Sequence, residues 1–265
     1  PIIKSVLHNF DPVDLEIIKQ DWQTIIDKIK AGEAHNISEG DTMYLAACTK
    51  GANAKSIRKQ PFSNIPAKQR AFSLKSSYMS AFARRVIDRQ LIPSLFNVDE
   101  LKSKTTLQLL QERFAPYIGK RVSEIAKLVD IPVTKNKAFN ANLISAVLGV
   151  KGTKLESLRE FSKANIKFKT IRLEPTGIPK EHMSFEQIDF HRWVNDAWED
   201  SQLYEKFEYT KYLFVVFQYD ETEKENKNRE PYLKGIMLWN MPEVVIEHEL
   251  KDLWKTTKAI LEEGV

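Results

Sequence analysis

The sequence predicts an α/β protein, more strictly α+β, in which helices flank a mixed central sheet and one lobe is helical and strongly basic. Three observations predict this class. Apolar residues recur at helical spacing near both ends of the chain. Short runs between residues 165 and 240 alternate, or are wholly apolar, as strands are. One long stretch in the first third carries cations and no acids.

Composition excludes several other classes. Of the 265 residues, 42% are apolar and 29% charged, as in soluble globular proteins, and the net charge is only +4. No apolar run approaches the ~20 residues that span a bilayer, and no signal segment opens the chain. The single cysteine, Cys48, excludes a disulfide framework and fits a reducing compartment. We therefore expect a cytoplasmic protein with no membrane partner and, because it begins at Pro1, a piece of a longer chain.

Two similar segments lie near the ends of the chain. Each reads as a short strand (residues 3–7 in the first), a proline, an amphipathic helix with a tryptophan, and a glycine at the helix end. Leu15, Trp22 and Leu253 are expected on the buried helix faces. The paired positions are Pro12 and Pro242, Trp22 and Trp254, and Gly32 and Gly264. A spacing of about 230 residues indicates two copies of one large domain. We expect residues 1–100 to end the first copy and residues 105–265 to form the second, with a polar boundary at 97–104.

Residues 50–87 contain nine Lys or Arg residues and no Asp or Glu. This composition favours a surface that follows nucleic-acid phosphates, although it does not separate duplex DNA from RNA or an acidic protein. Pro61 and Pro66 predict a loop, and helical spacing resumes near Ser76, with Met79 on the apolar face. The candidate contacts are Lys50, Asn53, Lys55, Arg58, Lys68, Arg70, Ser73, Lys75, Arg84 and Arg85.

The second half predicts short helices followed by strands. Apolar spacing places helices near 107–114, 122–128 and 143–147. Strands are expected at 165–171, 183–190 and 212–219, and the last should be central because it is apolar on both faces. Residues 193–207 favour a helix or helical loop, and the acidic stretch 220–230 favours a solvated hairpin.

The carboxylate pattern of a metal-dependent nuclease is incomplete. Such enzymes hold Mg²⁺ with two or more carboxylates beside a strand-borne lysine. An acid, six intervening residues and then acid-x-Lys fall on Glu160, Lys167 and Lys169, so a lysine stands at the second acid position. An ammonium there repels a divalent cation. We expect no catalytic residue, metal or cofactor in this chain, unless an acid at 156, 174 or 186 supplies the missing ligand.

Several segments resemble MutH and the related restriction endonucleases that cut at GATC. The specific matches are Glu-Ile-Ile-Lys-Gln-Asp-Trp at 16–22, Ser-Glu-Gly at 38–40, Tyr-Leu-Ala at 44–46, Cys-Thr-Lys-Gly-Ala-Asn-Ala-Lys at 48–55 and Ala-Lys-Gln-Arg-Ala-Phe-Ser-Leu-Lys-Ser at 67–76. The second half is similar more loosely, at 198–201 and 234–236.

This resemblance implies a restriction-endonuclease-like fold in two MutH-like units. It implies DNA contacts for residues matched in the first unit, namely Lys50, Asn53, Lys55, Arg70, Ser73 and Lys75. It also implies that a catalytic lobe served by Mg²⁺ precedes Pro1. The second unit would be a degenerate copy that binds DNA and favours two-site DNA, with self-association. A further family acid falls at Ser145, so Ser145, Glu160, Lys167 and Lys169 would be degenerate remnants of the catalytic set.

Three functions follow from these patterns. The first is sequence-specific binding of duplex DNA at a GATC-type site, as a non-cleaving part of a type II restriction endonuclease. The second is Mg²⁺-dependent cleavage by this chain itself. The third is a basic RNA-binding or protein-interaction module.

Overall fold

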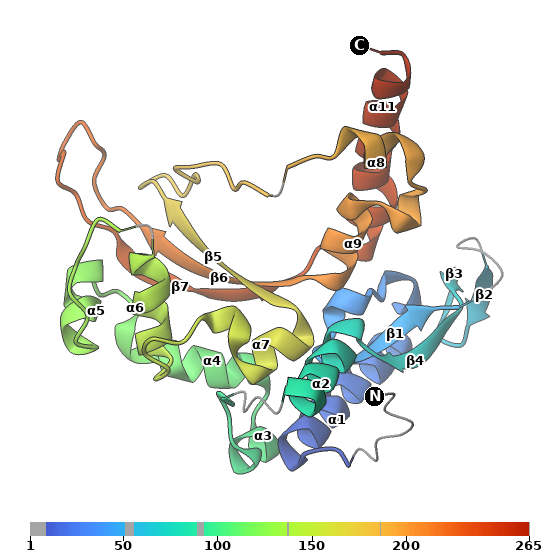
Figure 1. Ribbon diagram of the computed structural model, residues 1–265, viewed down its shortest axis with the longest axis horizontal. Coiled ribbons are helices and arrows are strands. Elements are labelled where there is room, and N and C mark those ends of the chain that lie inside the picture. The colour runs from blue at the N-terminus through green and yellow to red at the C-terminus, as the bar shows by residue number, and fades with distance from the viewer. Residues whose placement is uncertain (1–8, 51–55, 89–92, 137, 186, 265) are drawn as a thin grey trace.

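The described part of the chain before residue 97 contains helices α1 and α2 and two small antiparallel sheets (Figure 1). The computed structural model describes residues 9–50, 56–88, 93–136, 138–185 and 187–264, so the expected strand at 3–7 lies outside the described residues. Strand β1 pairs with β4, and β2 pairs with β3. The elements are α1 (Pro12–Lys30), β1 (Leu45–Thr49), β2 (Ile57–Gln60), β3 (Ser63–Lys68), β4 (Arg70–Leu74) and α2 (Ser76–Asp88).

Helix α1 begins and ends where the sequence predicts, but it buries a different face. The Asp11 side chain accepts from the Val13 N–H at 3.0 Å, and Gly32 after the helix end has a φ of 76°. Leu15 and Trp22, expected in the core, are 40% and 47% exposed. The buried positions are Val13, Asp14, Ile17, Asp21 and Ile25.

The reason is a polar contact that hydrophobic spacing does not show. The Asp21 carboxylate accepts from the backbone N–H groups of Met43, Tyr44 and Leu45, at 2.7, 2.6 and 2.9 Å. These bonds turn Asp21 inward and hold α1 against the start of β1. Helix α2 departs from its expected face in the same way, because Met79 is 46% exposed whereas Tyr78 is fully buried.

The second half contains a three-stranded mixed sheet with helices packed on it (Figure 1). Strand β6 is central and almost wholly buried, as its apolar sequence predicts; it is parallel to β5 and antiparallel to β7. The strands are β5 (Ile166–Leu173), β6 (Lys211–Gln218) and β7 (Tyr232–Trp239). The helices are α3 (Val98–Ser103), α4 (Thr106–Phe114), α5 (Val122–Leu128), α6 (Phe139–Val147), α7 (Arg159–Ala164), α8 (Phe190–Asn195), α9 (Gln202–Tyr209), α10 (Glu243–Val245) and α11 (Lys251–Glu262).

The strand expected at 183–190 is wrong. The described residues of this segment do not pair with a strand, and the segment leads into α8. Phe185 makes side-chain contacts instead of backbone pairing, since its ring lies 5.3 Å from that of Phe207 on α9 and 6.4 Å from that of Tyr212 on β6. In the last helix, Trp254 is buried as expected, whereas Leu253 is 57% exposed.

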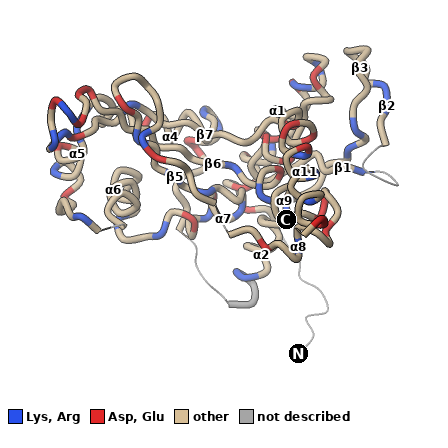
Figure 2. Tube along the Cα trace, turned by 90° about the horizontal axis from the view of Figure 1, so that it is seen from above, with Lys and Arg blue, Asp and Glu red and all other residues tan. Residues whose placement is uncertain are grey.

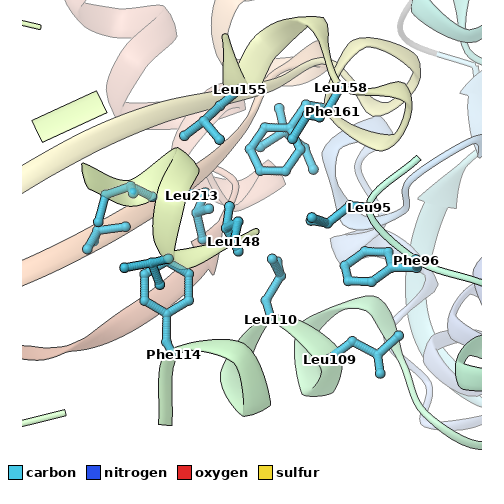
Figure 3. Packing of buried hydrophobic residues seen from close by; sticks show 14 of the residues in the cluster. Leu95, Phe96, Leu109, Leu110, Phe114, Leu148, Leu155, Leu158, Phe161 and Leu213 are labelled. Carbon is cyan, nitrogen blue, oxygen red and sulfur yellow. The ribbon is translucent and has the colours of Figure 1, made fainter. Parts of the chain in front are cut away.

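One hydrophobic core joins the two halves. Its buried residues include Ile17, Tyr44 and Tyr78 from the first hundred residues and Phe161 and Leu213 from the second half. Figure 3 shows the central part of this cluster, between α4, α7 and β6. The boundary expected at 97–104 contains α3, which packs on α1. The two segments therefore fold against each other, and their origin as two copies of one domain stays a prediction.

None of the described helices is long and apolar enough to cross a membrane.

Candidate nucleic-acid interface

A basic hairpin projects from the lobe that α1, β1, β4 and α2 form, which is called the first lobe below. Strands β2 and β3 form it, and Figure 2 shows Lys and Arg but no Asp or Glu along it. Arg58 and Lys59 are exposed, and so are large apolar side chains, with Phe62 at the turn 60% exposed. A two-stranded ribbon of this kind has the width of the DNA major groove.

The loop expected around Pro61 and Pro66 is therefore corrected to a β-hairpin, whereas the helix expected from Ser76 is present as α2. The basic lobe thus combines helices with β structure. Pro66 lies within β3. Each strand of a two-stranded sheet has one open edge where a missing N–H costs no hydrogen bond, so a proline is tolerated there. Pro61 occupies the turn.

The turn end of the hairpin is fixed to the end of α1. A Cβ at Gly32 would lie 2.7 Å from the backbone oxygen of Phe62, so the backbones approach closely only because this residue is glycine. The Gln60 side chain accepts from the Ala34 N–H at 3.1 Å and donates to the Ile65 carbonyl at 2.7 Å. These contacts orient the hairpin relative to the lobe.

The remaining expected contacts divide into an exposed group and an engaged group. Lys50 is exposed at the end of β1, and Arg84 and Arg85 are exposed on α2. Ser73 is half-buried in β4, opposite Ala46 in β1. Asn53 and Lys55 lie outside the described residues.

Three expected cations are instead bound inside the protein. Lys68 Nζ lies 2.6 Å from carboxylate oxygens of Glu243 and Glu247. Arg70 donates to the Ala47 carbonyl at 2.8 Å and lies 3.2 Å from Glu243. Lys68 and Arg70 therefore connect this lobe to the segment that begins at α10.

The third engaged cation is Lys75, which is buried and donates to the Thr42 carbonyl at 2.6 Å. Burial lowers the pKa of Lys75 to about 8, against the opposing effect of nearby carboxylates such as Asp21. Burial also raises the pKa of Glu208 well above its usual value, and the neighbouring Glu243 adds to that rise. These groups lie at the contact between the lobe and the sheet, away from solvent.

The remnants of the nuclease pattern do not converge. Glu160 is fully buried in α7 and accepts from the Ser94 hydroxyl and, at 2.9 Å, from the Leu95 N–H. Ser145 is buried in α6 and donates to the Asn142 carbonyl. Lys167 and Lys169 lie on the outward face of β5, since Ile166 and Phe168 pack on the core.

The residues present do not fit a divalent cation. Lys167 stands on β5 where the sequence pattern expects the second carboxylate. No group of three or more His, Cys, Asp or Glu side chains suited to a metal occurs among the described residues. Of the alternative acids, Glu174 is paired with Arg229 and Glu156 is exposed in a short 3₁₀ helix. Glu186 lies outside the described residues.

A cavity of about 530 Å³ beside the start of β5 was not predicted from the sequence. Its lining includes Lys167 on β5, Phe185 in the loop between β5 and α8, Trp193 on α8 and Lys206 on α9. Burial lowers the pKa of Lys206, and the charges of Lys169 and Lys167 lower it further. The sequence held no signal for this grouping because Lys206 is brought to β5 only by the packing of α9.

Comparisons with known proteins give two matches. Residues 152–252 match the family of the DNA mismatch repair enzyme MutH. The type II restriction enzyme Sau3AI of Staphylococcus aureus is 38% identical over 279 aligned residues, which include the whole chain. The chain spans 56% of the length of that enzyme.

Proposed function

From the match of residues 152–252 to the MutH family and the alignment of the whole chain with a type II restriction enzyme, we propose that the chain belongs with these proteins and binds duplex DNA without cutting it. The proposed target is a GATC-type sequence. The proposal includes a restriction-endonuclease-like arrangement in two MutH-like units, the second of which is a non-catalytic copy, and a cytoplasmic setting.

The projecting β2–β3 hairpin is the observation that carries this proposal. It combines exposed cations, which release counterions from phosphates, with exposed apolar side chains that fit the floor of a groove. Lys50, Arg84 and Arg85 supply further exposed cations. Lys68, Arg70 and Lys75 are proposed to support this surface from behind, because their charges are held by groups of the protein itself.

Absence of cleavage is proposed from the charge at the nuclease position. Lys167 puts a positive charge where a carboxylate ligand is needed, and Glu160 points into the core. The partners proposed beyond DNA are a catalytic lobe that uses Mg²⁺ and, on two-site DNA, a second copy of the protein.

The test measures binding by fluorescence anisotropy with a GATC duplex, a scrambled duplex and a single-stranded RNA of equal length. We expect the tightest binding to the GATC duplex. The double variant Arg58→Glu, Lys59→Glu should weaken binding at least tenfold and lower the salt dependence. The matched control is Lys127→Glu on α5, an equally exposed lysine at the other end of the molecule (Figure 1).

Two outcomes would favour the other functions. Equal binding to RNA and to both duplexes would support a general basic interaction module. Cleavage of a GATC-containing plasmid with Mg²⁺ would support a nuclease, and would contradict the role assigned to Lys167.

A further inference from the structure

The cavity beside β5 is surrounded by positive charge. Lys167 is exposed and lines it directly, and Lys169 follows two residues later on the same face of β5. Lys206 comes from α9 on the opposite side. Among the described lining residues the acid is Glu205, which is exposed, and the cation Arg192 is held by Asp196 at 3.2 Å.

Two of these lysines lie against one aromatic ring at the cavity. Nζ of Lys169 lies 5.8 Å from the centre of the Phe185 ring, and Nζ of Lys206 lies 5.4 Å from it. Lys169 Nζ also donates to the Ser184 carbonyl at 3.2 Å. Burial lowers the pKa of Lys206, and the charges of Lys169 and Lys167 lower it further. An anion placed between these ammonium groups relieves their mutual repulsion.

We propose that this cavity holds a phosphate of the bound duplex, gripped by Lys167, Lys169 and Lys206. A phosphodiester is a compact anion whose oxygens can accept from several ammonium groups at once. A Mg²⁺ ion together with one carboxylate would bring a net charge of +1 to this position, and Lys167 brings the same charge without the metal. The strand therefore keeps its attraction for a phosphate while it loses the chemistry that a metal supplies.

A neighbouring surface explains why the phosphate belongs to a duplex. Helix α9, which carries Lys206, also carries Glu208, and Glu208 accepts from the Glu39 N–H at 3.0 Å and lies 4.0 Å from Arg70. Arg70 pairs with Thr49 of β1, the residue before the exposed Lys50. Helix α9 therefore connects the cavity with the Lys50 end of β1. A double helix that contacts the first lobe can reach the cavity with its backbone. This inference rests on the proposed function, because it adds a second contact to the same bound duplex.

The experiment compares the double variant Lys167→Ala, Lys169→Ala with the unmodified chain and with Lys127→Ala. Binding to the GATC duplex is measured by anisotropy at several salt concentrations. The logarithm of the affinity falls as the logarithm of the salt concentration rises, and each lost phosphate contact should make this slope less steep by about 0.9. We expect a less steep slope in the double variant and an unchanged slope in Lys127→Ala.

A second readout follows the lysines directly. Acetylation of the unmodified chain, read by mass spectrometry, should be slowed several-fold at Lys167, Lys169 and Lys206 when the duplex is present, and should be unchanged at Lys127. An unchanged salt slope together with unchanged acetylation would overturn the inference. Protection by inorganic phosphate but not by duplex would also overturn it, because the cavity would then serve a free anion. If the unmodified chain does not bind the duplex at all, the proposed function itself is refuted.

Discussion

Removing the Asp14 carboxylate should strongly destabilise the protein. Asp14 is fully buried on α1. Its carboxylate lies 3.0 Å from Arg159 of α7 and is also paired with Lys163 of α7. It accepts from the Tyr78 hydroxyl at 3.0 Å. In Asp14→Ala the Lys163 ammonium stays buried without its carboxylate. Breaking a buried ion pair from one side costs about 3–5 kcal/mol.

The contacts that remain around Arg159 and Lys163 narrow the expected loss of unfolding free energy. Arg159 keeps a second carboxylate, Asp11, at 3.0 Å, so its charge remains compensated after the substitution. Among the described residues Lys163 keeps ring contacts, with Nζ 4.8 Å from the centre of the Tyr78 ring. We therefore expect a loss near the lower end, about 3 kcal/mol.

Urea unfolding followed by tryptophan fluorescence measures this loss. The control is Asp27→Ala, an exposed aspartate on the same helix, for which we expect a change within about 0.5 kcal/mol. If Asp14→Ala does not fold, the double variant Asp14→Ala, Lys163→Met should restore folding, because it removes the uncompensated charge. A loss for Asp14→Ala no larger than the control would refute the reasoning.

Three further predictions concern stability. Lys75 and Lys211 are buried and their pKa values are lowered to about 8, so the folded protein binds fewer protons than the unfolded chain above that pH. The free energy of unfolding should therefore rise between pH 8 and 10, by up to about 1.4 kcal/mol per pH unit for each lysine, and Lys75→Met should flatten this rise in urea titrations. Glu208 has a raised pKa, so the stability that its proton contributes is present below its usual pKa and is lost as pH rises through the folded value. Stability measured upward from pH 4.5 should fall less in Glu208→Gln, and an identical profile would contradict this. Gly32→Ala should cost about 1–2 kcal/mol, because its φ is positive and the added Cβ would meet the oxygen of Phe62, and an unchanged melting temperature would contradict that assignment.

Periodic patterns predicted much of the fold. The helices over 106–114, 122–128 and 139–147 and the central position of β6 follow from apolar spacing alone, because burial selects those residues directly. The hairpin was missed because its strands are largely exposed and contain Pro66, so neither alternation nor strand propensity marks them.

The site was harder to predict than the fold. Lys68 and Arg70 stand in a basic, acid-free stretch that is typical of DNA contacts. Their partner Glu243 lies far along the chain, and only the packing of α10 brings it near. Charge counts in a sequence do not show which charges are compensated within the protein. The lysine at the expected second carboxylate position, Lys167, could be noticed in the sequence because the pattern depends on spacing within one helix–strand unit.

The common core has a practical consequence for dissecting the molecule. A protease cut or a gene truncation near residue 100 would strip Ile17, Tyr44 and Tyr78 from the apolar side chains that cover Phe161 and Leu213. A fragment that starts at residue 105 should therefore be insoluble or only loosely packed. The unit that gene duplication would have copied, residues 105–265, is therefore shorter than the unit that folds around the common core. Recombinant fragments should keep the residues of both halves that form this core.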